Sequence, residues 1–198
     1  MQGKSLVRRV LWGFLLIGAV STMFMLGAMA VFTDQATSPA NAFTAGTVDV
    51  ALTPATAMFT VTQMAPGDVR YSGLQVTNSG NLALRYAMTT TADGSSTLDE
   101  QLDLTVDVVT GAGTDTIWYT ADDTIGEANI YGADGVLSAA AFGNPTQGNQ
   151  AGDRNLAASG SERLRFKVTL PLGTGNTYQG TSATVAFVYA AEQTTNNP

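Results

Sequence analysis

The sequence predicts an all-β fold, a jelly-roll-like antiparallel sandwich of two sheets with a long loop-rich insertion. In several segments the apolar residues recur at every second position, and clusters of Gly, Asn, Asp and Pro separate these segments. The 198 residues are 44% hydrophobic, which suits one domain with a substantial core. Because the chain has no cysteine, packing of this core must stabilise the fold without disulfides.

The amino terminus predicts a targeting segment. Basic residues precede an uncharged apolar run over residues 10–30, and Ala28 and Ala30 supply the small-x-small pattern that a signal peptidase needs. We therefore predict that residues 1–30 are a signal peptide, cleaved between Ala30 and Val31. The run is also long enough to cross a bilayer as a helix, so an uncleaved anchor is the alternative.

Three segments alternate most clearly between apolar and polar residues, which predicts strands with one buried and one solvated face. Their apolar positions are Leu82, Leu84, Tyr86 and Met88, then Leu102, Leu104, Val106 and Val108, and finally Leu164, Phe166, Val168 and Leu170. Weaker patterns predict strands at 47–52, 58–63, 69–77, 116–120 and 182–190. About eight strands of this length are typical of a two-sheet sandwich.

The segment 69–77 changes phase, because Val69 and Tyr71 share one face whereas Leu74 and Val76 share the other. A β-bulge at 72–73 would explain the change. Turn sequences at 65–68, 78–81 and 92–95 separate the neighbouring strands, since Gly and Asn readily adopt positive φ.

The region from Gly111 to Ser161 is rich in Gly, Asn, Asp and Ala and has little periodicity. Only residues 137–142, LSAAAF, could form a short helix. We expect this region to be an insertion that decorates one end of the sandwich, without a second domain. The sandwich domain is then predicted to span 42–190, followed by a polar tail at 191–198.

Charge and composition exclude several functions. The net charge of −7 makes nucleic-acid binding very unfavourable. Without histidine or cysteine, the usual general base, thiolate nucleophile and imidazole ligand are absent, so we predict no catalytic residue and no cofactor. Arg163, Arg165 and Lys167 alternate with apolar residues on one predicted strand, and all three are expected on its solvated face.

The best candidate for a metal site is calcium at Asp115, Asp122 and Asp123. Their spacing does not match an EF-hand loop, and Asp in such loops more often caps the backbone of a turn. Trp118 and Tyr119 could form a carbohydrate-stacking pair. On the strand predicted there only one of them would face outward, so a core tryptophan beside a surface tyrosine is the simpler interpretation.

Three blocks carry a family resemblance: GAMAVFTDQATSPANAFTAGTVDVAL at 27–52, MAPGDVRYSGLQVTNSGNLALRY at 64–86 and YQGTSATVAFVYAAEQ at 178–193. They resemble the TasA/camelysin family of secreted biofilm-matrix fibre proteins, whose precursors are cleaved by a dedicated signal peptidase. The resemblance implies a jelly-roll subunit whose freed amino-terminal segment inserts as a strand into its neighbour. The matching donor strand is Val31, Phe32, Thr33, Asp34, Gln35, Ala36 and Thr37, in an extended segment that reaches residue 41.

The resulting hypothesis is a secreted, non-enzymatic subunit of extracellular fibres or pili, found in the matrix or at the cell surface. Its partners would be further copies of itself, the signal peptidase during export, and a minor anchoring or capping protein. A disordered mature terminus is the alternative for residues 31–41. For the whole chain the alternatives are a monomeric adhesive domain and a secreted metalloprotease of the camelysin type, although the chain has no histidine to bind zinc.

Overall fold

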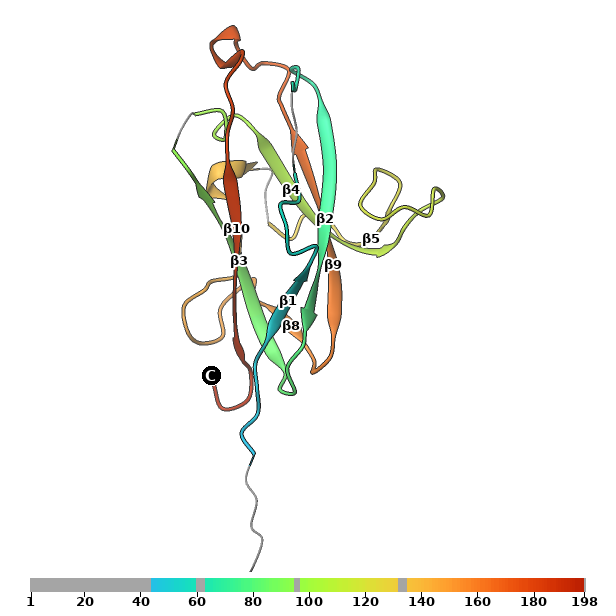
Figure 1. Cartoon of the computed structure of the whole chain (residues 1–198), viewed down its shortest axis with the longest axis vertical. Helices are drawn as coiled ribbons and strands as arrows, with labels where there is room; N and C mark the ends of the chain where they lie inside the picture. The colour runs from blue at the N-terminus through green and yellow to red at the C-terminus, as the bar shows by residue number, and fades with distance from the viewer. Residues whose placement is uncertain (1–43, 60–62, 95–96, 132–134, 198) are drawn as a thin grey trace, which may run out of the picture. The chain divides into compact units, whose positions relative to one another are not determined.

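The computed structural model describes residues 44–59, 63–94, 97–131 and 135–197. Residues 45–198 form a compact unit that contains every described strand. The fold is nearly all β, in two antiparallel sheets, as the alternation predicts (Figure 1). The long strands β2 (Val69–Asn78), β3 (Leu84–Ala92) and β4 (Asp103–Gly111) alternate between the sheets along the chain.

The first sheet has the order β1-β2-β9-β4-β5, with β6 also paired to β4, and the second has the order β10-β3-β7, with β8 also paired to β3. The remaining strands are β1 (Val50–Thr53), β5 (Thr124–Glu127), β6 (Gly135–Val136), β7 (Ala141–Phe142), β8 (Arg154–Leu156), β9 (Ser161–Thr169) and β10 (Val185–Gln193). Two short 3-10 turns, η1 (Leu137–Ala139) and η2 (Asn176–Tyr178), complete the described elements.

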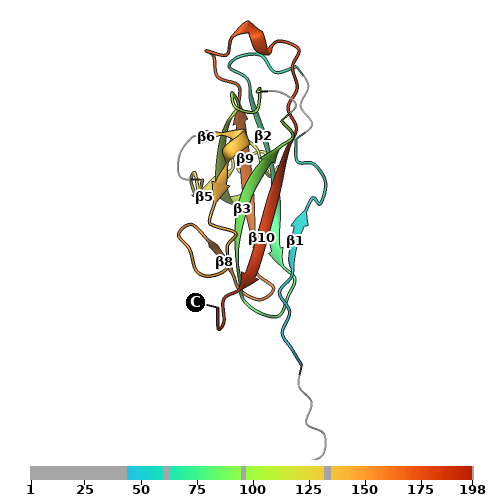
Figure 2. The same ribbon diagram turned by 90° about the vertical axis from the view of Figure 1, so that its left-hand side faces the viewer.

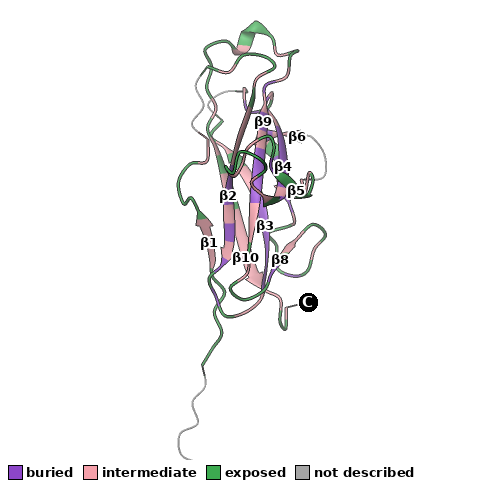
Figure 3. Cartoon of the chain, turned by 90° about the vertical axis from the view of Figure 1, so that its right-hand side faces the viewer, coloured by how far each residue is buried: buried purple, intermediate pink, exposed green. Residues whose placement is uncertain are grey.

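The core lies between the two sheets and consists of the alternating apolar residues that the sequence singled out (Figure 3). Leu84, Met88, Leu104, Leu164 and Phe166 have no exposed surface. Because successive strand residues point to opposite faces, the residues between them lie on the outer faces of the sheets. The three strongest strand predictions are therefore confirmed by β3, β4 and β9.

The predicted bulge at 72–73 is wrong. β2 pairs with β9 in unbroken register from Val69 opposite Thr169 to Thr77 opposite Ser161. Leu74 faces the core, whereas Val69, Tyr71 and Gly73 lie on the outer face. There the guanidinium of Arg165 lies 5.2 Å from the ring of Tyr71 and the ring of Tyr119 covers Gly73, while Val69 is exposed. The outer face of β2 therefore carries Tyr71 without any bulge.

The weaker strand predictions had mixed outcomes. β1 begins three residues later than predicted and ends one residue later, and β10 is shifted by three residues at both ends. β2 appears as expected, and no strand forms at 116–120. That segment forms a loop in which Thr116 and Tyr119 adopt positive φ. The predicted strand at 58–63 is also wrong for its described residues 58, 59 and 63, while residues 60–62 lie outside the described part.

The region 111–161 is more than a decoration, which corrects our expectation. It supplies β5, β6, β7 and β8, and it places Leu137, Ala140, Phe142 and Leu156 in the core. The predicted helix at 137–142 is a single 3-10 turn followed by β7. The sequence pattern did not reveal these strands, because each is only two to four residues long and the residues around them are mostly small or polar.

Candidate functional site: the open edge of the sandwich

The acidic residues singled out for calcium lie in the loop between β4 and β5, residues 112–123, which we call the acidic arm. One carboxylate oxygen of Asp122 accepts hydrogen bonds from the backbone N–H of Thr114 (2.7 Å) and of Asp115 (3.2 Å), and from the hydroxyl of Thr114 (2.7 Å). Asp122 Oδ1 accepts a bond from the hydroxyl of Thr120 (2.8 Å). These bonds, first that from the Thr114 hydroxyl, hold the pKa of Asp122 well below its usual range.

The other two aspartates of the arm also bind its own backbone. Asp115 accepts a hydrogen bond from the N–H of Ile117, and Asp123 accepts bonds from those of Tyr119 and Thr120. This is the local capping that short polar side chains commonly provide in loops. Among the described residues no group of three or more Asp or Glu is arranged to hold a metal ion.

Two arginines of β9 bind the arm to the outer face of the first sheet. The prediction that Arg165 lies on a solvated face is therefore wrong. Arg165 is buried, pairs with Asp107 on β4 at 2.7 Å, and donates a hydrogen bond to the carbonyl oxygen of Thr120 (2.6 Å). Arg163 lies 4.3 Å from the ring centroid of Trp118. Neither Trp118 nor Tyr119 belongs to the core, so our interpretation of a core tryptophan is also wrong.

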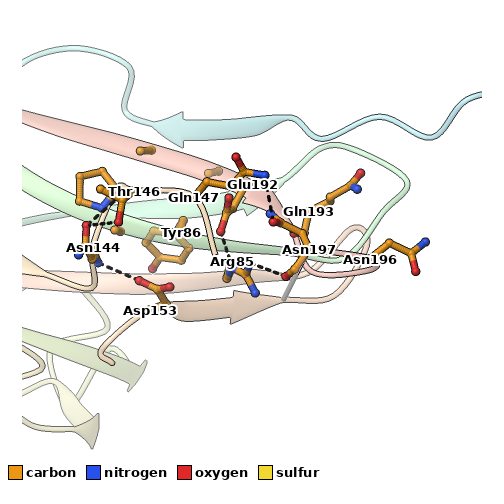
Figure 4. Close-up of a pocket in the computed structure, with 14 residues that line it drawn as sticks. Arg85, Tyr86, Asn144, Thr146, Gln147, Asp153, Glu192, Gln193, Asn196 and Asn197 are labelled. Atoms are coloured by element: carbon orange, nitrogen blue, oxygen red, sulfur yellow. Dashed lines mark hydrogen bonds and ion pairs between the residues drawn. The ribbon is translucent and has the colours of Figure 1, made fainter. Parts of the chain in front are cut away.

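A cleft of about 470 Å³ lies on the outer face of the second sheet, between the loop 144–153 and the carboxyl-terminal residues (Figure 4). Its floor contains Arg85, which is buried and donates hydrogen bonds to Glu192 (2.5 Å) and to the carbonyl oxygen of Asn197 (2.6 Å). The Arg85 guanidinium lowers the pKa of Glu192. Gln147 also donates to Asn197 (3.4 Å), so the polar groups of the cleft largely bind one another.

One long side of the sandwich, which we call the closed side, is formed by the short strands β5, β6, β7 and β8 (Figure 2). A polar network joins the two sheets there: Tyr86 on β3 donates a hydrogen bond to Glu162 on β9, and Arg154 on β8 binds both Glu162 and Glu127 on β5. Burial, together with the neighbouring Glu162 carboxylate, raises the pKa of Tyr86 far above its usual value.

The opposite long side ends in β10, and its hydrogen-bonding pattern shows that one edge of this strand has no partner among the described residues. Asp93 donates its backbone N–H to Thr184 (3.0 Å), and Thr194 donates to Ala83 (3.1 Å). Because alternate residues of an antiparallel strand bond to the same neighbour, the even-numbered residues of β10 bond to β3. The odd-numbered residues, from Val185 to Gln193, direct their N–H and C=O groups away from the sheet.

The same odd-numbered residues direct their side chains between the sheets, where they are only half-buried. Val185, Phe187, Tyr189 and Ala191 pack against the core, and Phe187 meets Phe166 at 5.1 Å between ring centroids. The Tyr189 hydroxyl is buried without a hydrogen-bond partner.

Across the sandwich from β10, β1 pairs with the Gln75–Asn78 part of β2. Farther along β2, the hydroxyl of Ser72 donates a hydrogen bond to the carbonyl oxygen of Met58 (2.6 Å), and Met58 packs against the core. We call the free edge of β10 the open edge. It combines backbone groups that have no partner among the described residues with core side chains that are only half-buried.

The residues predicted for cleavage, Ala28, Ala30 and Val31, and the donor strand 31–37 lie outside the described residues, so both stay predictions. Sequence reasoning named the donor but not its acceptor. The alternation at 182–190 showed a strand, yet no local pattern distinguishes an edge strand from a central one. In the described part of the chain, neither 3-10 turn has the length that crossing a bilayer as a helix requires.

The sequence model of one protein family, described as Camelysin metallo-endopeptidase, matches residues 6–197 of the chain. No curated protein sequence matches it. The family match covers residues 6–30 of the predicted targeting segment and all described strands.

Proposed function

The chain belongs to the camelysin metallo-endopeptidase family, and from this membership we propose that it is a structural subunit of extracellular fibres, assembled by donor-strand exchange. The segment 31–37 of one copy would add as a strand to the sandwich of the next. The proposal includes secretion, removal of residues 1–30, and a place in the extracellular matrix or at the cell surface. Further copies of the chain are its main partners.

The open edge carries this proposal. An unpaired strand edge is a template for another extended segment, and natural proteins usually shorten, charge or cover such edges. Here the free edge of β10 runs for nine residues, and Val188 on the outer face of the strand is half exposed. An added strand would pair the free backbone groups and complete the burial of Phe187 and Tyr189.

The proposed donor has the composition that such an edge requires. Asp34 is its only charged residue, and Val31 and Phe32 offer apolar side chains. Burying one such side chain is worth roughly 1.5–3 kcal/mol, and each backbone hydrogen bond adds about 0.5–1.5 kcal/mol. These contributions together can exceed the repulsion between subunits that each carry a negative net charge.

A metallopeptidase is the rival function, because the family description names one. Catalytic zinc sites use histidine, cysteine and carboxylate ligands around an open coordination position. The complete sequence has neither histidine nor cysteine, and the carboxylates of the acidic arm already bind backbone groups of the arm. The residues present therefore do not fit a catalytic zinc ion, and we propose that the chain is not an enzyme.

The test compares three forms of the chain by negative-stain electron microscopy: residues 31–198, residues 38–198, and residues 31–198 with Phe32→Asp. We expect filaments from the first form and folded monomers from the other two. Asn41→Asp is the matched control, because it adds the same charge outside the donor strand and should leave filaments intact. Added salt should speed filament growth, since it screens repulsion between subunits.

Three outcomes would contradict the proposal. Ordinary filaments from residues 38–198 would show that assembly uses another surface. A stable monomer from residues 31–198 would favour the adhesive domain, and hydrolysis of casein by the zinc-supplemented protein would favour the peptidase.

A further inference from the structure

The two ends of the sandwich differ in what they offer to another copy of the chain. The segment before β1 enters at the end where β2 turns into β3, because Asn81 bonds to Thr47 through both its side chain and its backbone, and Ser79 donates to Asp49. β10 begins at the opposite end, where Thr184 accepts a hydrogen bond from Asp93. The nine residues of β10 span roughly 30 Å between these ends.

A filament in which each copy repeats the orientation of the last places the entry end of one copy against the Val185 end of the next. The donor strand would then reach the free edge of β10 from the Val185 end, with residue 37 there and residue 31 near Gln193. The twelve residues 38–49 span at most about 40 Å, which permits this connection. If the donor strand instead ran parallel to β10, residues 38–49 would have to double back along their own sandwich.

We propose that the donor strand of a second copy lies antiparallel to β10, with Asp34 opposite Tyr189 and its carboxylate accepting a hydrogen bond from the Tyr189 hydroxyl. This inference rests on the proposed function and adds the orientation and register of the contact. It also fixes the polarity of the filament.

The phase of the donor follows from its alternation. One face carries Phe32, Asp34 and Ala36, and the other carries Val31, Thr33, Gln35 and Thr37. The first set directs an aromatic ring and a methyl group toward the core and leaves the more polar set outside. Residues directly opposite each other in an antiparallel pair point to the same face, so the first set faces the odd-numbered residues of β10.

The register follows from size and polarity. With Asp34 opposite Tyr189, the large Phe32 lies opposite the small Ala191, and the small Ala36 lies opposite the large Phe187. A shift of two residues either way would place the carboxylate of Asp34 opposite Phe187 or Ala191, which offer no side-chain donor. The buried hydroxyl of Tyr189 lacks a partner. The core already contains one such pair, Tyr86 with Glu162.

Cysteine cross-linking tests the orientation, because the chain has no natural cysteine. On the outer face, Gln35 would lie opposite Val188 and Thr33 opposite Ala190, in pairs whose Cα atoms are about 4.5 Å apart, within disulfide range. Filaments of chains carrying Gln35→Cys with Val188→Cys, or Thr33→Cys with Ala190→Cys, should oxidise to ladders of linked subunits. Thr33→Cys with Val188→Cys and Gln35→Cys with Ala190→Cys, the pairs that a parallel strand in the same register would join, should not.

A second pair of variants tests the hydrogen bond. Tyr189→Phe should leave the melting temperature of the monomeric chain unchanged, because the hydroxyl has no partner there. It should speed dissociation of filaments in urea by about tenfold or more, the loss expected for a hydrogen bond to a charged group. Asp34→Ala should have a similar effect, and the double variant should dissociate no faster than the Asp34→Ala single variant.

Cross-links that join Thr33→Cys to Val188→Cys and also Gln35→Cys to Ala190→Cys would overturn the antiparallel orientation. Filaments of Tyr189→Phe as stable as the parent would overturn the register. Both results require filaments, so they differ from failure of the proposed function, in which residues 31–198 form none.

Discussion

The closed side and the open edge of this sandwich differ in how far their outermost strands expose backbone N–H and C=O groups that could pair with another strand. On the closed side the outer strands β5, β6, β7 and β8 are two to four residues long. The pairing of β4 with β5 is interrupted by register shifts, and Arg154 ties the two sheets together. On the open edge, β10 is nine residues long and continuous, and its free edge has no partner in the part of the chain that the structure describes.

Under the proposed function, this difference would favour assembly in a single direction. Short, bulged or charged edges resist the addition of another strand, whereas a long regular edge accepts one. If both sides were open, copies could add on either side and aggregate without order. The polar groups are distributed accordingly: Tyr86 on the closed side has a carboxylate partner, and Tyr189 on the open edge has none.

The largest expected effect is loss of the buried pair between Arg165 and Asp107 next to the closed side. Arg165→Ala would leave Asp107 buried without its charge partner, which should lower the free energy of unfolding by about 3–5 kcal/mol. Arg70→Ala is the matched control, because Arg70 pairs with Asp68 in a more exposed position and should contribute less than about 1 kcal/mol. Urea unfolding of the monomeric chain measures both, and equal effects would contradict the contrast.

The second largest effect on stability is expected from the contact between the acidic arm and the first sheet at Gly73. A methyl group there would overlap the ring of Tyr119 and the carbonyl oxygen of Leu164, so Gly73→Ala should destabilise the chain by about 1–3 kcal/mol. Gly173→Ala meets no atom within 4 Å and should change stability by less than about 0.5 kcal/mol. A harmless Gly73→Ala would mean that the arm does not rest on β2.

A smaller effect is expected from alkaline pH. The pKa of Tyr86 is raised in the folded chain, first by burial, and is about 10 when unfolded. Above pH 10 the unfolded chain therefore loses a proton that the folded chain keeps, and stability falls by about 1.4 kcal/mol per pH unit from this residue. Tyr86→Phe should flatten the profile measured by urea unfolding between pH 9 and 11. An unchanged slope would show that Tyr86 ionises freely in the folded chain.

The smallest expected effect is that of calcium. Since Asp115, Asp122 and Asp123 already accept hydrogen bonds from the arm, neither calcium nor a chelator should shift the melting temperature. One kcal/mol would shift the midpoint of a domain this size by roughly 2–4 °C, so the assay can detect binding. A rise of several degrees with calcium would restore the metal hypothesis for these residues.

The sequence predicted the elements whose signal is local. Leu104 and Val106, or Leu164 and Phe166, alternate with polar residues on a single strand, and the structure confirms both patterns. The turn at 65–68 is also confirmed, with Gly67 at positive φ and the N–H of Asp68 bonded to the carbonyl of Ala65.

What the sequence could not predict depends on contacts between distant segments. Arg165 appeared solvated because it alternates with apolar residues, yet the acidic arm, some forty positions earlier in the chain, covers it. The bulge at 72–73 was wrongly predicted for the same reason, because the sequence does not show that the distant Tyr119 covers Gly73. The open edge is likewise a property of the sheet order, because the alternation of β10 says nothing about whether a strand lies on one side of it or on both.

Proline substitution on β10 tests the central claim, that the free edge of this strand accepts the next copy. Proline removes one backbone N–H, which at Ala191 points to the free edge and at Ala190 bonds to β3. In chains of residues 31–198, we expect Ala191→Pro to fold as a monomer but to form no filaments in electron micrographs. Ala190→Pro should instead destabilise the fold itself. Filaments of normal length from Ala191→Pro would contradict the account, because they would show that assembly does not use this edge.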